Sequence, residues 1–233
     1  IWSFLLSLRP YQTRGVQFLS AKKGALLADD MGLGKTVQTI TAMSKVLKTN
    51  RRNRVLIVVP AALKTNWENE LEKWAPEYHV VNLKGGARDR RAFYNLPIPI
   101  LIASYEQVCS DAIDGLMKIT FDLVILDEAQ RIKNPNSTVA LACSLIPRQR
   151  AWALTGTPIE NRVDDLISIV NFVDPGLVGR HMPRQELQST VETVFLRRKK
   201  SEVLSDLPPI TYQDLDLHLY GEQKKQYEKL WAA

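Results

Sequence analysis

Residues 32–36, Gly-Leu-Gly-Lys-Thr, have the composition and the context of a phosphate-binding loop. They follow the apolar run 24–28 and precede apolar residues at helical spacing, which predicts a strand, a tight turn and a helix. Backbone N–H groups at a helix N-terminus attract an anion, and Lys35 would add a positive charge beside the terminal phosphates of a nucleotide. The Thr36 hydroxyl would bind Mg²⁺. The residues expected to contact the nucleotide are Asp30, Met31, Gly32, Leu33, Gly34, Lys35 and Thr36.

Asp29 departs from the usual phosphate-loop pattern, Gly-x-x-x-x-Gly-Lys-Thr, because it stands where the first glycine should be. That glycine lies farthest from the terminal phosphates and matters least for the Lys-Thr chemistry. A glycine-containing surface turn would also explain the loop, so the loop alone does not establish a nucleotide site.

Two adjacent carboxylates, Asp127 and Glu128, supply the second half of the expected site, because they end the apolar run 121–127. Unpaired carboxylates at the end of a buried strand would be costly, so they call for a cation or a reaction. We expect Asp127 to hold Mg²⁺ and Glu128 to orient and deprotonate an attacking water. A solvated acidic turn explains this pair alone, but not both halves together. We therefore predict an ATP site at which strands 24–28 and 121–127 are neighbours and Lys35 meets the acid pair.

Strand-like and helix-like segments alternate through the first 175 residues. One helix is expected to have Val37, Ile40, Met43 and Leu47 on its apolar side. The alternation predicts right-handed crossovers and an α/β fold, with a mostly parallel sheet, helices on both faces and ligands at the carboxyl ends of the strands. The apolar runs expected to be strands are 24–28, 54–60, 78–83, 98–104, 121–127 and 150–156.

A second helix is expected to open at Thr65, with Glu68 as the partner of a capping box. After residue 175 the pattern changes, and we divide the chain into an ATP-binding lobe at 1–175 and an appended segment at 176–233. Within that segment, residues 210–219 alternate like a strand and the last residues form the pattern of an amphipathic helix.

The composition is that of a folded protein with a basic surface: 233 residues, 45% hydrophobic, with a formal net charge of +6. The charge is compatible with a polyanionic partner, although each basic cluster alone (48–54, 87–91 and 196–200) is more simply a solvated face. The two cysteines lack metal-ligand spacing, which favours a reducing, intracellular compartment. No apolar run approaches the roughly 20 residues of a membrane helix, so no membrane partner is expected.

With these residues in place, the sequence resembles the Swi/Snf-type branch of the superfamily-two helicase-like ATPases, which are double-stranded DNA translocases. In this branch an acidic residue at position 29 is ordinary. The resemblance covers essentially the whole chain and rests on LRPYQTRGVQFL (8–19), DDMGLGKTVQTI (29–40), LIVVPAALKTNW (56–67), IASYEQV (102–108), DEAQRIKNPNS (127–137), ALTGTPIEN (153–161) and FLRRKKSEVLSDLPP (195–209).

The resemblance implies a RecA-like P-loop lobe and roles for further residues. Gln12 would read the adenine, and Gln130 would join the acid pair to the 153–161 motif. There Thr155, Gly156 and Thr157 would convey the state of the nucleotide to the DNA-facing surface. A Thr-Gly-Thr-Pro turn that caps the next helix is the alternative.

The implied partner is double-stranded DNA, gripped by its phosphates without reading of bases. Trp67 and Trp74 are expected to pack in the core rather than to stack on bases. The expected DNA-facing residues lie on loops along one rim: Lys64, Asn66, Trp67, Gly85, Gly86, Ser104, Tyr105, Lys133 and Asn134.

The resemblance also implies a second RecA-like lobe that this sequence does not contain. The chain starts with Ile1 rather than methionine, so we expect it to be a piece of a longer protein. An arginine from the second lobe would contribute about 10³–10⁵ in rate, so this lobe alone should bind ATP and hydrolyse it poorly. Stretch 176–195 is short for the family, either because this member is compact or because a loop is absent. The motif Asp-Glu-Ala-Gln ends in Gln where the familiar helicase form ends in His, which favours a prokaryotic origin. The protein would then be cytoplasmic or nucleoid-associated, whereas a eukaryotic protein would be nuclear.

Three functions are compatible with the sequence. The first is a lobe of a double-stranded DNA translocase that displaces or remodels a protein–DNA complex. The second is a strand-separating DNA or RNA helicase, against which the Arg-Ile-Lys-Asn and Leu-Arg-Arg elements argue. The third is a nucleotide-gated binding module without turnover, against which the intact Lys35, Asp127 and Glu128 argue.

Overall fold

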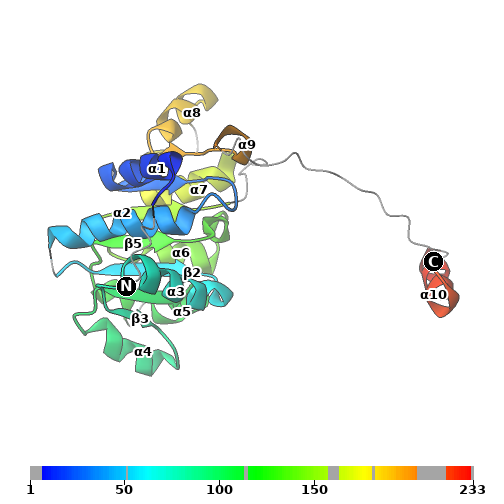
Figure 1. Cartoon of the computed structure of the whole chain (residues 1–233), viewed down its shortest axis with the longest axis horizontal. Helices are drawn as coiled ribbons and strands as arrows, with labels where there is room; N and C mark the ends of the chain where they lie inside the picture. Colours follow the sequence, from blue (N-terminus) through cyan, green and yellow to red (C-terminus); the bar gives the residue numbers. More distant parts are fainter. Residues whose placement is uncertain are drawn as a thin grey trace. The chain divides into compact units, whose positions relative to one another are not determined.

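The structure, a computed structural model, describes residues 7–50, 52–112, 115–156, 163–179, 182–203 and 219–231. The chain forms two compact units, Ile1–Val203 and Leu204–Ala233 (Figure 1). The described part of the second unit carries the helix α10 (Gly221–Trp231), along which residues 221–230 are exposed. Within the described ranges, no helix is both long and apolar enough to cross a membrane.

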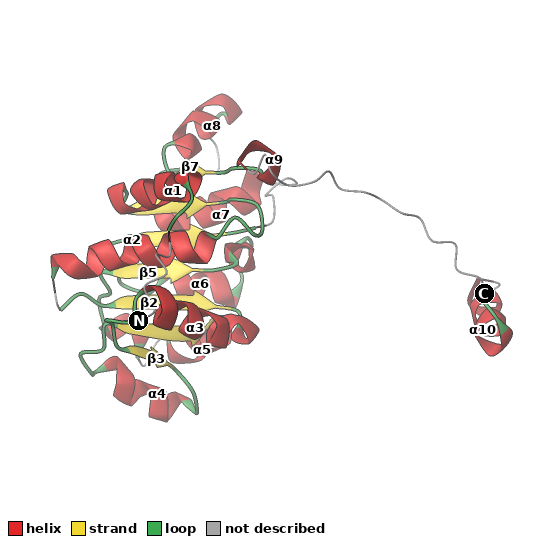
Figure 2. Cartoon of the chain, viewed as in Figure 1, coloured by secondary structure: helices red, strands yellow, loops and turns green. Residues whose placement is uncertain are grey.

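The first unit is built around a sheet of seven described strands, each parallel to its neighbours (Figure 2). The strand order is β3-β4-β2-β5-β6-β1-β7. The predicted α/β fold with a parallel sheet is therefore confirmed. The strands are β1 (Gly24–Leu27), β2 (Val55–Val59), β3 (Val80–Asn82), β4 (Ile100–Ser104), β5 (Leu123–Leu126), β6 (Ala151–Leu154) and β7 (Phe195–Leu196).

Each of the six expected runs contains one of these strands, whereas β7 was not expected. β7 pairs with β1 in parallel, with Phe195 opposite Leu26 and Leu196 opposite Leu27. It follows the boundary expected at residue 175, so residues on both sides of that boundary share one sheet. The expected strand at 210–219 lies outside the described residues except at its last position.

Helices cover both faces of the sheet, and two hydrophobic clusters mark the two faces. On one face lie α1 (Pro10–Ala21), α2 (Lys35–Thr49) and α3 (Lys64–Trp74), and on the other lie α5 (Tyr105–Asp111), α6 (Thr138–Ser144) and α7 (Val163–Val173). The remaining described helices are α4 (Ala87–Tyr94), α8 (Arg184–Glu192), α9 (Lys200–Val203) and the 3₁₀ turns η1 (Ala61–Leu63), η2 (Leu116–Lys118) and η3 (Ala129–Ile132).

The central strand β2 shows why these segments fold as they do. Leu56 and Val58 belong to one hydrophobic cluster, and Val55, Ile57 and Val59 belong to the other. All five side chains are fully buried, because side chains alternate between faces and helices cover both. A continuous apolar run therefore becomes a strand that is buried on both faces, and the polar residues that flank it lie at the strand ends.

Helix α3 starts differently from the prediction. It begins at Lys64, and its N-cap, Leu63, makes no side-chain capping bond. The 3₁₀ turn η1 leads directly into it, and the Leu63 N–H donates to the Pro60 carbonyl. The Glu68 carboxylate accepts a hydrogen bond of 2.8 Å from Asn82 Nδ2. The expected capping box of Thr65 and Glu68 is therefore wrong.

Candidate active site

The residues expected to do chemistry follow β1, β5 and β6 at the carboxyl edge of the sheet. β6 pairs with both β1 and β5, so it separates the strand before the phosphate loop from the strand before Asp127. The expectation that these two strands are direct neighbours is wrong. Lys35 nevertheless interacts electrostatically with Glu128 and Asp127 across the end of β6. The two halves of the predicted site are thus brought together.

The phosphate loop is shaped by two glycines in left-handed backbone conformations. Gly32 has φ +84° and Gly34, the N-cap of α2, has φ +75°, a region that L side chains rarely adopt. A Cβ on Gly34 would also stand 2.5 Å from Gln12 Nε2. Leu33, between them, is fully buried and anchors the turn. Helix α2 starts at Lys35, so its free N–H groups point into the loop.

Lys35 is folded back onto this loop. Its Nζ donates to the Asp29 carbonyl at 2.8 Å and to the Asp30 carbonyl at 3.4 Å. Burial lowers the pKa of the Lys35 ammonium, while the carboxylates of Glu128 and Asp127 act in the opposite direction. An ammonium has three donors, so two carbonyl partners leave one for an anion. A bound phosphate is the ligand that this buried cation fits.

Asp127 is 8% exposed and its carboxylate is held at both oxygens. Oδ2 accepts from Trp67 Nε1 at 2.7 Å, and Oδ1 accepts from the Glu128 N–H at 3.0 Å. Burial raises the pKa of the Asp127 carboxyl, and the hydrogen bond from Trp67 opposes that rise. A carboxylate offers about four acceptor positions, so positions remain for a cation.

The donor set fits the expected Mg²⁺. In the described residues, no group of three or more His, Cys, Asp or Glu side chains could hold a metal ion by itself. Mg²⁺ usually takes one or two carboxylates together with phosphate oxygens and water, so it does not need such a group. Asp127 and the Thr36 hydroxyl are the residues that would hold it.

Glu128, Gln130 and Thr155 form a chain of side chains from β5 to β6. Gln130 Nε2 donates to Glu128 Oε2 at 2.6 Å, and Thr155 Oγ1 donates to Gln130 Oε1 at 2.9 Å. The amide bridge implied by the resemblance is therefore present, and the coupling role of Thr155 stays a prediction. Glu128 has φ +51°, a strained conformation for a non-glycine residue, which this chain of bonds holds in place. Thr157 lies outside the described residues.

Gly156, two residues after β6, lies directly beside the phosphate loop. A Cβ there would be 2.8 Å from Met31 Cγ and 3.0 Å from Lys35 Nζ. A side chain at this position would therefore displace the lysine. Met31 itself is 54% exposed, as expected for a residue at the mouth of the site.

Gln12 also packs on the phosphate loop, from α1. Its Nε2 donates to the Leu33 carbonyl at 3.3 Å, and its Oε1 accepts from the Arg9 N–H at 2.9 Å. These bonds hold the start of α1 against the turn. Recognition of adenine by Gln12 stays a prediction.

Asp29 has a partner that the sequence analysis missed. It is fully buried, and Arg198 binds both of its carboxylate oxygens, with Nε 2.9 Å from Oδ1 and Nη2 in contact with Oδ2. The guanidinium also donates to Gln38 Oε1 at 2.7 Å and to the Tyr11 carbonyl. Asp29 stands where the phosphate-loop pattern has a glycine, and a buried carboxylate there requires a cation. This was the signal in the sequence that could have predicted a basic partner.

The segment around Arg198 follows the phosphate loop residue by residue. The Ala28 N–H donates to the Leu196 carbonyl at 2.8 Å, and the Asp30 N–H donates to the Arg198 carbonyl at 3.0 Å. The Lys200 N–H then donates to Asp30 Oδ2 at 3.0 Å. A Cβ on Gly32 would stand 3.3 Å from Lys200 Nζ, so this second ammonium lies over the loop.

The expected DNA-facing residues follow β2, β3, β4 and β5 at the same edge of the sheet, but they differ in exposure. Lys64 is half-buried, and its Nζ donates to Gln107 Oε1 at 2.9 Å and to the Leu83 carbonyl. Five of the nine are exposed to solvent: Asn66, Gly85, Gly86, Lys133 and Asn134.

Three of the nine expected DNA-facing side chains are buried. Trp67 and Tyr105 are fully buried, and Ser104 is 4% exposed. The Ser104 hydroxyl caps α5 by accepting from the Gln107 N–H at 3.2 Å. Direct DNA contact by these three side chains is therefore a wrong expectation, whereas core packing of Trp67 is confirmed.

The basic cluster 87–91 is not simply a solvated face. Arg90 is 6% exposed, and its Nε and Nη2 bind the two carboxylate oxygens of Asp111 at 2.6 Å each. The Tyr94 hydroxyl donates to the same carboxylate at 2.6 Å. Arg90 Nη1 donates to the Gly85 carbonyl, so this ion pair holds the exposed glycine loop.

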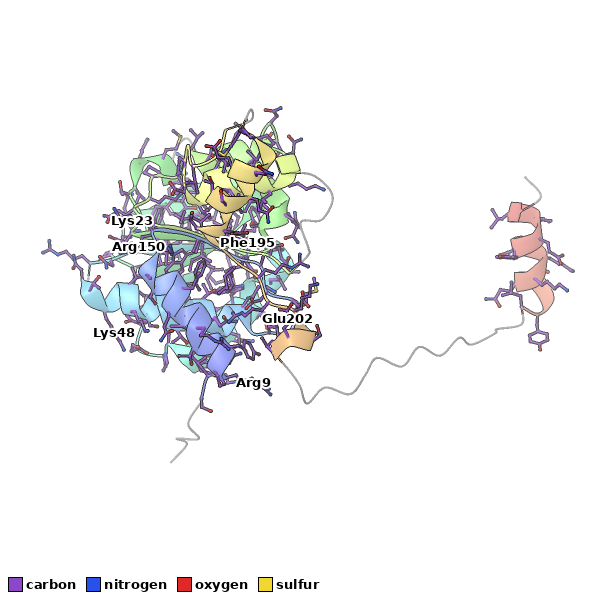
Figure 3. The ribbon with its side chains drawn as sticks, turned by 90° about the horizontal axis from the view of Figure 1, so that it is seen from above. Arg9, Lys23, Lys48, Arg150, Phe195 and Glu202 are labelled. Carbon is purple, nitrogen blue, oxygen red and sulfur yellow. The ribbon has the colours of Figure 1, made fainter. Side chains whose placement is uncertain are left out.

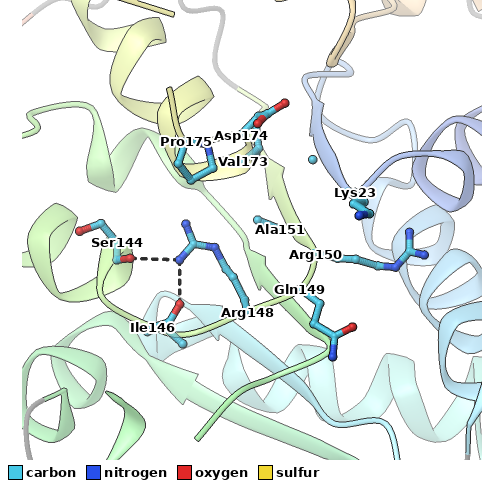
Figure 4. Close-up of a pocket in the computed structure, with 11 residues that line it drawn as sticks. Lys23, Ser144, Ile146, Arg148, Gln149, Arg150, Ala151, Val173, Asp174 and Pro175 are labelled. Atoms are coloured by element: carbon cyan, nitrogen blue, oxygen red, sulfur yellow. Dashed lines mark hydrogen bonds between the residues drawn. The ribbon is translucent and has the colours of Figure 1, made fainter. Parts of the chain in front are cut away.

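A cavity of about 360 Å³ lies at the amino ends of β1 and β6, opposite the phosphate loop. Its Arg148 donates to the carbonyls of Ile146 at 2.8 Å and Ser144 at 3.2 Å (Figure 4). Figure 3 shows Lys23 and Arg150, which line this cavity, far from Glu202, which lies two residues after Lys200. The guanidinium of Arg148 holds loop carbonyls, and the cavity is separate from the candidate active site.

Comparison with known proteins agrees with this geometry. Residues 11–233 match the family model described as the SNF2-related domain. The chain belongs to the SNF2-related domain family. The Swi/Snf resemblance and the RecA-like lobe are thereby confirmed.

Three relatives place this SNF2-related lobe in context. A solved Sulfolobus solfataricus SWI2/SNF2 ATPase core in complex with dsDNA is 35% identical, with a TM-score of 0.77, over 87% of this chain and 47% of that one. An uncharacterized ATP-dependent helicase of Mycoplasma genitalium is 38% identical over 96% of this chain and 23% of that protein. The ISWI chromatin-remodeling complex ATPase ISW1 of Saccharomyces cerevisiae is 29% identical over 96% of this chain and 22% of that protein. The chain thus spans less than half the length of each.

Proposed function

We propose that this chain is the first ATP-binding lobe of an ATP-driven translocase on double-stranded DNA, which remodels or displaces DNA-bound protein. The observation that carries the proposal is the convergence of Lys35, Asp127 and Glu128 at the carboxyl edge of one parallel sheet. A Lys-Thr loop at a helix N-terminus and an acid pair across one strand are what hydrolysis of a nucleoside triphosphate requires.

Each side chain has a defined part in the proposed reaction. Lys35 binds the terminal phosphates. Asp127 and the Thr36 hydroxyl would hold Mg²⁺, which would neutralise charge on the phosphates. Glu128 orients the attacking water and takes up its proton. Gln130 keeps the Glu128 carboxylate in place through its bond of 2.6 Å. Gln12 contacts the adenine from α1.

Double-stranded DNA is the proposed partner because the archaeal relative was solved in complex with dsDNA and is 35% identical to this chain. The exposed Asn66, Gly85, Gly86, Lys133 and Asn134 follow strand ends on one edge and offer amides, backbone N–H groups and a cation. Such groups contact phosphates without reading bases, so binding should be nonspecific and weaken steeply with salt. A second RecA-like lobe would close on this one and supply an arginine.

A strand-separating helicase is the second candidate, favoured by the name of the mycoplasma relative, an ATP-dependent helicase. The two candidates differ in the nucleic acid that stimulates ATP hydrolysis. In the protein that contains this lobe, duplex DNA should raise the rate more than either single strand. If only single strands stimulated ATP hydrolysis, and the protein separated the strands of a labelled duplex, the helicase function would be favoured over the translocase function.

Two substitutions test the chemistry. Lys35→Ala should abolish duplex-stimulated hydrolysis, because the cation at the phosphates is lost. Glu128→Gln should keep ATP bound while it lowers turnover by roughly 10²–10⁴. Normal turnover of the Lys35 variant, or loss of ATP binding by the Glu128 variant, would contradict the assigned roles.

A further inference from the structure

Two buried aromatic side chains from different helices hold the same aspartate. Trp67 Nε1, on α3, donates to Asp127 Oδ2 at 2.7 Å, and the Tyr105 hydroxyl, on α5, donates to the Asp127 backbone carbonyl at 2.7 Å. Both aromatic residues are 0% exposed. The side chain and the main chain of Asp127 therefore each accept a hydrogen bond from a buried ring of a different helix.

The same two helices start at the rim that is proposed to face DNA. α3 begins at Lys64 and α5 begins at Tyr105. Lys64 Nζ donates to Gln107 Oε1 at 2.9 Å, and Gln107 Nε2 donates to the Leu83 carbonyl at 2.9 Å. Leu83 precedes the exposed glycine loop. The starts of α3 and α5 and this loop are therefore joined as one unit.

We propose that Trp67 and Tyr105 are positioning residues that couple phosphate contacts of a DNA duplex, made at the start of α3 and at the exposed glycine loop, to the Mg²⁺-binding carboxylate of Asp127. The physical reason is the stiffness of the connection. Core side chains are close-packed, so a shift of either helix moves its ring, and each ring moves Asp127 through its hydrogen bond. Hydrogen-bond partners of metal ligands set the orientation of the ligand and the affinity for the metal. The inference rests on the proposed function.

Trp67→Phe and Tyr105→Phe each remove one donor and keep a buried ring. The chain offers matched controls. Trp74, on the same helix, has a buried Nε1 with no hydrogen-bond partner among the described residues, so Trp74→Phe removes an indole N–H that holds nothing. Tyr78→Phe removes a hydroxyl whose bond to the Ser44 carbonyl is long, at 3.3 Å.

The first measurement is the Mg²⁺ concentration that half-saturates binding of a fluorescent ATP analogue to the chain. It should rise about tenfold in Trp67→Phe, in line with losses of such partners, and stay at the wild-type value in Trp74→Phe. In EDTA, which removes Mg²⁺, Trp67→Phe and Trp74→Phe should bind the analogue equally well. A general structural defect in Trp67→Phe would weaken binding in EDTA as well. Equal Mg²⁺ midpoints in Trp67→Phe and Trp74→Phe would overturn the proposal.

The second measurement is the ratio of duplex-stimulated to basal ATP hydrolysis in the protein that contains this lobe. The ratio should fall at least threefold in Trp67→Phe and Tyr105→Phe and be unchanged in Trp74→Phe and Tyr78→Phe. Wild-type ratios in both test variants would overturn the coupling. A wild-type protein that duplex DNA does not stimulate would instead contradict the proposed function, and the Mg²⁺ midpoint would still decide the role of Trp67.

A third measurement needs no variant. The indole N–H resonance of Trp67, assigned in the ¹⁵N spectrum of the wild-type chain, should shift when Mg²⁺ is added to the ATP-bound chain, and shift again with a short duplex. The resonance of Trp74 should stay in place. A Trp67 resonance that neither addition moves would overturn the proposal even if Trp67→Phe failed to fold.

Discussion

Arg198 binds both carboxylate oxygens of Asp29, a residue 169 positions earlier in the chain, and this pair fixes the back of the phosphate loop. The Asp29 backbone carbonyl in turn accepts from Lys35 Nζ at 2.8 Å. The position of Lys35, which we propose to bind phosphate, therefore depends on an arginine near the end of the first unit.

Arg198→Gln should destabilise the fold and weaken nucleotide binding. The Asp29 carboxylate would remain buried without its cation, which should lower the free energy of unfolding by about 3 kcal/mol. Because Lys35 would no longer be held in place, the dissociation constant of an ATP analogue should rise roughly tenfold, which corresponds to about 1.4 kcal/mol of binding free energy. Urea unfolding and fluorescence titration measure the two effects.

The double variant Asp29→Asn with Arg198→Gln serves as the control. Residues in direct contact are not additive, so the double variant should be more stable than the sum of the single losses predicts. Additivity within about 0.5 kcal/mol would mean that the ion pair contributes no coupling.

Lys200→Ala should weaken ATP binding without changing stability. Lys200 is exposed, and its Nζ lies 3.3 Å from where a Cβ on Gly32 would stand, over the phosphate loop. Loss of one charge near the phosphates should raise the dissociation constant of an ATP analogue several-fold, by about 1 kcal/mol at an exposed site. Lys199→Ala, which removes an exposed neighbouring ammonium, should bind like the wild type. If the two substitutions weakened ATP binding equally, the effect would come from the general surface charge and not from the position of Lys200 over the loop.

Gly156→Ala should weaken ATP binding, although Gly156 itself carries no charge and follows β6 rather than the phosphate loop. The added methyl would stand 3.0 Å from Lys35 Nζ and 2.8 Å from Met31 Cγ, so the lysine must move. We expect ATP affinity to fall about tenfold, while the surface position of the contact keeps the loss of stability near 1 kcal/mol. Gly179→Ala is the matched control, because no atom lies within 4 Å of its Cβ position. Calorimetric titration with ATP compares the two variants. Equal ATP affinities would show that space beside Lys35 is not required at Gly156.

The Arg90–Asp111 pair should make stability depend on pH in the acid range. Burial alone would raise the pKa of the Asp111 carboxyl, but hydrogen bonds from Arg90 and Tyr94 outweigh it, so the pKa lies below its ordinary value. A carboxyl with a lowered pKa in the folded state stabilises the fold above its unfolded pKa of about 4, and this contribution disappears as pH falls through the folded pKa.

Asp111→Asn should therefore flatten the acid part of the stability curve. At neutral pH it should cost about 3 kcal/mol, because the Arg90 guanidinium would be left buried without a carboxylate. Urea unfolding at a series of pH values compares the two proteins. Curves that stay parallel down to the acid limit would exclude Asp111 as a source of the pH dependence.

Much of the fold could be predicted because its signals are local. Each of the six apolar runs contains a strand, since a strand covered on both faces must be apolar throughout. β7 was missed because Phe195 and Leu196 are too short a run to stand out beside Arg197 and Arg198. The order of the strands was also out of reach, and with it the place of β6 between β1 and β5, because strand order depends on which helices pack together.

The sequence by itself determined which residues of this protein are candidates for chemistry: Lys35, Asp127 and Glu128 are recognisable because their residue types at strand ends have few other uses. Only the tertiary structure decided which polar groups face inward. Tyr105, Arg90 and Arg198 resemble surface contacts in the sequence, yet each is held inside by a partner 21 or more positions away. A polar side chain can face inward only if a partner compensates the free-energy cost of its burial. That partner is adjacent only after the chain has folded.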